Sequence, residues 1–244
     1  MAGLPDSTTE SASAKLQQSL DRDSKLQFNF SGFFLIIGFM VRSASVFSLG
    51  FIFYLTAAIE GLLAGCFSLG TPMRQRLGSF YTFGLLVPVA GIVWCVIDRV
   101  RLPTVPPWDW MVSAGVCAVV ININEARIMA KYRAPDVPLG QAMAAALRAN
   151  LPQSLSVVGA GIVTVASQSP WIDILVALGI ALSHLGAPHL LKRLAEFDVG
   201  ESGTGGAVAY QLAITHPRLG ILLTPAWQEG AAAVRRKAAL RRSV

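Results

Sequence analysis

Residues 147–191 read LRANLPQSLSVVGAGIVTVASQSPWIDILVALGIALSHLGAPHLL, two apolar segments of helix length separated by the turn-forming sequence QSPW at 168–171. Each segment is close to the roughly 20 apolar residues that a helix needs to cross a bilayer. The first segment carries four polar side chains inside its apolar run: Asn150, Gln153, Ser154 and Ser156. Because polar groups at membrane depth are costly, they are a default hypothesis for a functional site.

The composition extends this prediction to the whole chain. Of 244 residues, 53% are hydrophobic and 14% are charged, and the mean hydropathy is +0.55. A soluble domain usually has about 25% charged residues, so we expect an all-α, multi-pass integral membrane protein. The first 29 residues are polar and lack the apolar core of a signal peptide, so we expect residues 1–26 to be a disordered cytoplasmic arm.

Hydropathy predicts six transmembrane helices within a domain at 27–195. Their expected bounds are 27–41, 45–70, 80–98, 110–130, 146–168 and 171–191. Of the 20 Lys and Arg residues, all but Arg42, Arg99 and Arg101 fall on the side of the termini. The positive-inside rule therefore predicts that both termini are cytoplasmic. The same topology explains the net charge of +6, so we expect no nucleic-acid partner.

Residues 196–244 are predicted to be a short cytoplasmic tail. The segment is polar and flexible at first, then has an apolar piece interrupted by two prolines, Pro217 and Pro225, and ends in a basic stretch. The prolines argue against a seventh span and favour a hairpin or an interfacial segment. The basic end is expected either to lie on anionic lipid or to be a solvated charged end.

Three strings carry a family resemblance. They are ANLPQSLSV at 149–157, WIDILVAL at 171–178 and RSASV at 42–46, with a weaker match of RLG at 76–78. Over residues 30–195, and specifically over 147–183, the chain resembles the transmembrane domain of the cation diffusion facilitator family. These proteins are six-helix metal/proton antiporters, so the resemblance implies a six-helix bundle and transport of a cation.

The resemblance also indicates that the metal site of the family is lost. The family uses a His-x-x-x-Asp pair on each of the second and fifth helices, and this spacing places both ligands on one helix face. Gln153 and Val157 stand at the fifth-helix positions, and Tyr54 and Ala58 at the second-helix positions. These residues cannot replace imidazole and carboxylate ligands, so we expect no zinc site. The small cytoplasmic metal-sensing domain of the family is not expected in residues 196–244 either.

Other polar residues are candidates for a replacement site. Glu60 on the second predicted helix and Asn122, Asn124 and Glu125 on the fourth lie at membrane depth, where they are expected to meet Asn150 and Gln153 in the cytoplasmic half. A carboxylate in such a place can carry a proton or bind a cationic group.

Structural roles remain alternatives for each candidate. Glu125 could instead form an interfacial ion pair with Arg127 or Lys131, and Asn150 and Gln153 could hydrogen-bond between helices. Tyr54 is a further candidate for the substrate or proton pathway, but it could simply pack. Asp173 is expected to cap the sixth helix. The chain has no phosphate-binding glycine loop, nucleophile elbow or HExxH sequence, and we expect no cofactor.

Three functions are compatible with this pattern. The first is a divergent transporter that moves a cation or a small cationic solute by exchange with protons. The second is a membrane-embedded enzyme of specialised metabolism that uses the bundle cavity as an active site. The third is a non-transporting partner that dimerises with an intact family member. The small residues Gly159, Ala160 and Gly161 would suit a homodimer or heterodimer in the membrane.

Overall fold

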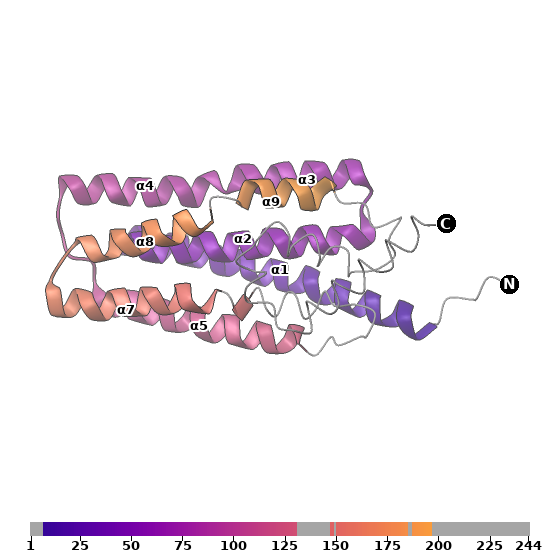
Figure 1. The fold of residues 1–244 in the computed structure, drawn as a ribbon, viewed down its shortest axis with the longest axis horizontal. Helices are drawn as coiled ribbons and strands as arrows, with labels where there is room; N and C mark the ends of the chain where they lie inside the picture. Colours follow the sequence, from indigo (N-terminus) through magenta and orange to yellow (C-terminus); the bar gives the residue numbers. More distant parts are fainter. Residues whose placement is uncertain (1–6, 131–146, 149, 185–186, 197–244) are drawn as a thin grey trace, which may run out of the picture.

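The computed structural model describes residues 7–130, 147, 148, 150–184 and 187–196. In this part of the chain every regular element is a helix (Figure 1). The helices, in chain order, are α1 (Ser7–Val41), α2 (Ala44–Ser68), α3 (Thr71–Gly84), α4 (Leu86–Arg101), α5 (Trp108–Met129), α7 (Leu151–Ser167), α8 (Trp171–Ser183) and α9 (Ala187–Glu196). They run nearly parallel to the long axis of one elongated bundle.

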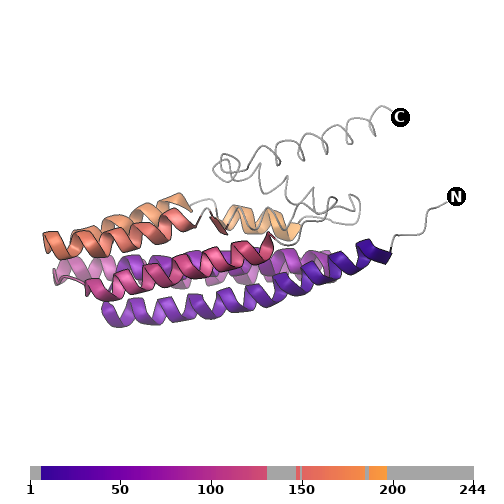
Figure 2. The ribbon, with the colours of Figure 1, turned by 90° about the horizontal axis from the view of Figure 1, so that it is seen from below.

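The two ends of the bundle differ. The connections after α1, α4 and α7 all lie at one end, which we call the turn end (Figure 1). Helices α1 and α3 begin toward the opposite end, and α9 lies in that half of the bundle, so we call it the α9 end (Figures 1 and 2).

Helix α2 is the centre of the bundle. It packs against α1 along its length and also contacts α3, α4, α5, α7, α8 and α9. Its membrane-length segment is 94% buried within the protein. A helix that is hydrophobic around its whole circumference is expected in such a position, and α2 is apolar on every face apart from isolated polar residues.

Helices α1 and α2 form a tight hairpin. A Cβ atom added to Gly38 would lie 2.9 Å from the backbone nitrogen of Phe47, and one added to Gly50 would lie 2.8 Å from Leu35. The two backbones therefore approach each other at positions where only glycine fits. Arg42, with φ of 52°, makes the turn, and the Ser43 hydroxyl caps α2 by accepting a hydrogen bond from the Val46 N–H.

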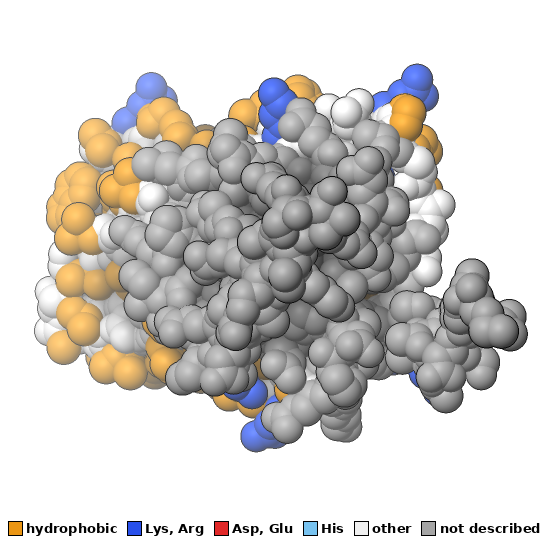
Figure 3. All heavy atoms as spheres, turned by 45° about the vertical axis from the view of Figure 1, so that its right-hand side comes forward, with side chains coloured by type: hydrophobic (Ala, Val, Ile, Leu, Met, Phe, Trp, Pro, Cys, Tyr) orange, Lys and Arg blue, Asp and Glu red, His pale blue; other side chains and the backbone are white. Residues whose placement is uncertain are grey.

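The prediction of an integral membrane protein agrees with the length and composition of the helices. Four segments are long and apolar enough to cross a membrane: Gln17–Val41, Ala44–Gly65, Pro72–Arg101 and Trp108–Met129. Apolar side chains also face outward on the flanks, as in Figure 3, where hydrophobic side chains cover much of the visible flank. Helices α7 and α8 are apolar but shorter, with 17 and 13 residues. The count of six spans therefore stays a prediction.

Where residues 1–26 were expected to be a disordered arm, the described part of this segment is helical. Helix α1 begins at Ser7 and continues without a break into the apolar segment. Within the polar part, Leu20, Asp23, Ser24 and Gln27 are all buried. This 3–4-residue spacing places them on one face of α1, which is covered by its neighbours, so this face packs although it is mostly polar.

Two other helix boundaries differ from the prediction. The third predicted helix begins earlier, at Thr71, and is interrupted at Leu85, before Pro88. Pro88 has no N–H to donate to the Gly84 carbonyl, which accounts for the interruption. The sixth predicted helix, 171–191, is two helices, since α8 ends at Ser183 and α9 begins at Ala187. The turn predicted at 168–171 is confirmed, because α7 ends at Ser167 and α8 begins at Trp171.

Candidate functional site

A group of buried and partly buried polar side chains lies inside the bundle, in the half nearer the α9 end. Helices α1, α2 and α5 supply two residues each, and the other two are Ser154 of α7 and Asn150, the residue before α7. We call this group the polar cluster; its members are Asp23, Gln27, Thr56, Glu60, Asn122, Glu125, Asn150 and Ser154. With a rise of 1.5 Å per residue, Glu60 lies about 24 Å along α2 from the turn end. A hydrocarbon layer about 30 Å thick that began at the turn end would contain Glu60.

Glu60 is the most unusual member of the polar cluster. Its side chain is completely buried, and among the described residues neither carboxyl oxygen has a hydrogen-bond partner. The carboxyls that act on it electrostatically are those of Glu125 and Asp23, which have the same charge sign. A buried charge is normally paired or hydrogen-bonded, so Glu60 lacks the compensation that burial requires.

Glu125 is held from the side of α1. The Gln27 side-chain amide donates a hydrogen bond to Glu125 Oε2, whereas Glu125 Oε1 and the Gln27 carbonyl oxygen have no partner within the described residues. Asp23 lies one turn before Gln27 on α1 and contacts the Arg22 guanidinium at 3.2 Å. The Arg22 side chain is 67% exposed, so this edge of the polar cluster is one side chain away from the protein surface.

A hydrogen-bond network crosses the bundle next to these carboxyls. Asn150 donates to the Thr56 hydroxyl at 3.1 Å, and Asn122 donates to the Ser154 hydroxyl at 3.4 Å and to the Ala118 carbonyl at 2.9 Å. Thr56 lies one turn from Glu60 on α2, and Asn122 one turn from Glu125 on α5. These hydrogen bonds therefore extend the polar cluster from the carboxyl side chains toward the middle of the bundle.

The candidates predicted from the sequence separate into two groups. Glu60, Asn122, Glu125 and Asn150 come together in the polar cluster, whereas Asn124 is exposed on the outer face of α5. Gln153 donates instead to the Ser183 hydroxyl of α8, at 3.4 Å.

Tyr54 also lies apart from the carboxyls. It packs against the rings of Phe28 and Tyr81, and its hydroxyl lies against Gly84 of α3. The packing alternative for Tyr54 therefore describes its surroundings better than a place in the polar cluster.

The described residues contain no ion pair between Glu125 and Arg127, which was one alternative for Glu125. Arg127 is exposed, and the described residues contain no salt bridge to Glu125. Lys131, the other expected partner, lies outside the described residues.

Sequence reasoning missed Asp23 and Gln27, because both lie in the segment that was expected to be disordered or at its border. The signal that could have identified them is their spacing. Leu20, Ser24, Gln27, Ser31 and Phe34 follow one another at intervals of three or four residues and are all buried. This is the pattern of one helix face, even though most of its members are polar.

A second buried polar group lies at the turn end. Asp173, at the start of α8, accepts hydrogen bonds from the Ser43 hydroxyl at 2.7 Å, the Ala44 N–H at 2.7 Å and the Ser45 N–H at 2.9 Å. The prediction that Asp173 caps its own helix is therefore wrong, because it caps α2. It is favourably placed at the positive end of the α2 dipole.

The cation of this group is Arg99, whose side chain is 2% exposed and lies 4.0 Å from Asp173. Arg99 also donates to the backbone carbonyls of Arg42 and Thr104 and to the Thr104 hydroxyl. It thus joins α4, the α1–α2 turn and the connection after α4. We call Ser43, Arg99, Thr104 and Asp173 the turn-end network.

The described residues contain no group of three or more His, Cys, Asp or Glu side chains that could hold a metal ion. At the positions of the family metal pairs, Ala58 and Val157 are fully buried apolar residues. Comparisons with family models, curated proteins and solved structures find no significant match to this chain. The resemblance to cation diffusion facilitators therefore stays a prediction.

Proposed function

We propose that this protein carries a cation, or a small cationic solute, across the membrane in exchange for protons, and that Glu60 and Glu125 are the groups that bind both. The observation that carries the proposal is Glu60, which is fully buried at membrane depth with neither carboxyl oxygen hydrogen-bonded within the described residues.

Electrostatics explains why such a site would exchange cations for protons. Burying an ionised carboxylate costs several kcal/mol unless an opposite charge or hydrogen bonds compensate. The carboxyls of Glu125 and Asp23 act electrostatically on Glu60, so ionisation of all three would add repulsion to this cost. Protons on the carboxyls or a cation between them would each neutralise the site. Mutually exclusive occupancy by protons and a cation is the basis of antiport.

The chemistry of the side chains favours a hard or organic cation over zinc. The polar cluster offers carboxylate, amide and hydroxyl oxygens from Glu60, Glu125, Gln27 and Thr56. Oxygen ligands suit hard cations, whereas zinc sites are usually built from imidazole and thiolate groups. Organic ammonium groups would be bound by the same carboxylates through charge-assisted hydrogen bonds.

The two ends of the bundle differ in a way that favours alternating access to the site. Near the α9 end, Asp23 and the exposed Arg22 connect the polar cluster with the surface. At the turn end, the buried Arg99 and Asp173 close the bundle. We infer that the site faces the α9 end in this conformation and that the turn-end network must rearrange before a cation can leave on the other side. By the positive-inside rule, the α9 end is the cytoplasmic one.

Proteoliposomes containing a pH-sensitive dye test the proposal. Vesicles with an imposed proton gradient are given a panel of alkali, alkaline-earth and organic cations, and cation-dependent proton movement is recorded. Wild-type protein should show it for at least one cation, and Glu60→Gln should weaken it ten- to a hundredfold, the equivalent of about 1.5–3 kcal/mol for a lost charged interaction.

The matched control is Asp109→Asn, which removes an exposed carboxylate at the start of α5, far from the polar cluster. This variant should transport like the wild type. Absence of any cation-dependent proton movement in the wild type would refute transport. Equal activity of Glu60→Gln and wild type would refute Glu60 as the binding group.

A further inference from the structure

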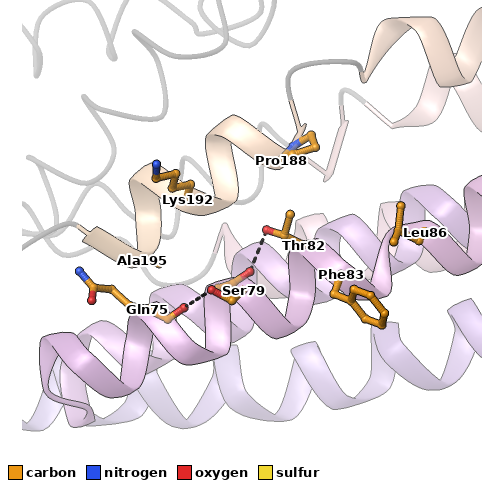
Figure 4. Close-up of a pocket in the computed structure, with 9 residues that line it drawn as sticks. Gln75, Ser79, Thr82, Phe83, Leu86, Pro188, Lys192 and Ala195 are labelled. Atoms are coloured by element: carbon orange, nitrogen blue, oxygen red, sulfur yellow. Dashed lines mark hydrogen bonds between the residues drawn. The ribbon is translucent and has the colours of Figure 1, made fainter.

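A groove runs along the outside of the bundle between α3 and α9. It has a volume of about 810 Å³, and its lining residues include Gln75, Ser79, Thr82, Phe83, Leu86 and Lys192. The two helices touch where Gly78 faces Ala195, and the groove opens beside this contact (Figure 4). The volume is within the range of about 300–1,000 Å³ that is typical of ligand sites.

The lining of the groove changes from polar to apolar along its length. Gln75, Ser79 and Lys192 lie toward the α9 end, and Phe83 and Leu86 lie farther along the outside of the bundle, toward the turn end (Figure 4). Phe83 and Leu86 are 73% and 57% exposed, and they belong to a segment long and apolar enough to cross a membrane. The groove therefore has a polar end at the membrane surface and an apolar end at the depth of the acyl chains.

The hydroxyls along the groove are already used within their own helix. Ser79 donates to the Gln75 carbonyl at 2.9 Å and Thr82 to the Gly78 carbonyl at 2.8 Å. The middle of the groove thus presents mainly methylene and methyl surface to an occupant. Among the described residues, the only charged side chain that lines it is Lys192, an exposed cation.

We propose that this groove binds one anionic phospholipid, with the phosphate beside Lys192 and an acyl chain along Phe83 and Leu86. The occupant must be amphipathic and negatively charged at its polar end, and a membrane surrounds the protein with such molecules. A basic residue near an anionic lipid surface contributes about 1 kcal/mol, so Lys192 provides a preference of roughly fivefold for anionic over zwitterionic headgroups. The proposal is independent of transport.

Native mass spectrometry of the full chain tests the preference. Protein in nanodiscs of equal parts phosphatidylglycerol and phosphatidylcholine is released, and the lipid that remains bound is identified. We expect one retained phosphatidylglycerol per chain, and a roughly fivefold fall in Lys192→Gln. The control Arg127→Gln removes an exposed cation from α5, outside the groove, and should leave retention unchanged.

Two further measurements locate the lipid. Ser79→Trp should displace it by filling the middle of the groove, with the helical circular dichroism spectrum unchanged. A photoreactive benzoylphenylalanine at position 83 should cross-link to lipid. Cross-links to a second copy or to residues 197–244, displacement by soluble glycerol phosphate, or equal retention in Lys192→Gln and wild type would each overturn the proposal.

Discussion

Replacement of Asp173 by alanine should be among the most damaging single changes in this protein. The carboxylate accepts three hydrogen bonds, from the Ser43 hydroxyl and the N–H groups of Ala44 and Ser45, and it is the negative partner of Arg99. All of these groups lie in the buried interior of the turn end. The change therefore removes the acceptor of the first two N–H groups of the central helix and leaves a buried guanidinium without its carboxylate.

The magnitude follows from those contacts. Loss of an N-cap costs about 0.5–2 kcal/mol, and removal of one partner from a buried ion pair costs about 3–5 kcal/mol. The two effects overlap, because the same carboxylate serves both, so we expect Asp173→Ala to lower the free energy of unfolding by about 3–5 kcal/mol. For a chain of this size, this corresponds to a fall in the melting temperature of roughly 10 °C.

Asp173→Asn distinguishes the contribution of charge from that of shape. Oδ1 accepts from Ser43 and Ser45, while Oδ2 accepts from Ala44 and faces Arg99. An amide can keep the first pair of hydrogen bonds, but its NH₂ group would then oppose the Ala44 N–H and the guanidinium. We therefore expect a smaller loss than for alanine, about half of it.

The assay is denaturant titration and thermal unfolding in detergent, followed by circular dichroism. Asp109→Asn is the control, since Asp109 is an exposed acid in the first turn of α5. If Asp173→Ala were as stable as Asp109→Asn, the interpretation of the turn-end network as a stabilising contact between α2, α4 and α8 would be refuted.

Three further predictions concern packing and the polar cluster. Gly38→Val should destabilise the α1–α2 hairpin by at least 1–3 kcal/mol in the same denaturant assay, because a Cβ there would lie 2.9 Å from the Phe47 backbone nitrogen; an unchanged midpoint would contradict this close approach. Phe34→Ala should cost about 3–5 kcal/mol because the side chain is fully buried, whereas the outward-facing Phe39→Ala should cost much less, so equal losses would refute the burial pattern of α1. Asn122→Ala should weaken cation-dependent proton movement in proteoliposomes, while Asn124→Ala on the exposed face of α5 should not, and the reverse order would refute the orientation of α5.

The sequence predicted the helical class and the membrane-length segments because these depend on composition and local hydropathy alone. The turn before Trp171 was also predictable, since Pro170 and the polar residues before it disfavour a continuous helix. The extent of α1 was not. Its first half has the composition of a solvated arm, and Leu20, Asp23 and Ser24 are buried only because α2 and other helices cover one face of α1. This burial depends on tertiary packing, which cannot be inferred from the composition of the segment.

The candidate site, too, could be predicted only in part from the sequence. The membrane depth of Glu60 and Glu125 could be inferred from their positions in apolar segments. Which of their helix faces points into the bundle was not assigned. Helical spacing separates Asn122 and Glu125 from Asn124, since residues three apart share a face and a residue two positions on does not. The structure places Asn122 and Glu125 inside and Asn124 outside. The partner of Asp173 could not be predicted at all, because Ser43 is 130 residues away in sequence.

The position of Asp173 also relates the stability of the bundle to its proposed cycle. Helix α2 carries both Glu60 and the N-terminal N–H groups that donate hydrogen bonds to Asp173, so the proposed cation site and the closure of the turn end are on one element. If α2 moves when a cation replaces protons at Glu60, the hydrogen bonds from Ala44 and Ser45 to Asp173 must lengthen or break. A substitution that weakens this cap should then increase leakage of protons through the protein even when no cation is supplied. Dye-loaded proteoliposomes of Asp173→Asn would show this as a faster collapse of the proton gradient than in Asp109→Asn. Equal rates would mean that closure of the turn end does not depend on the Asp173 cap.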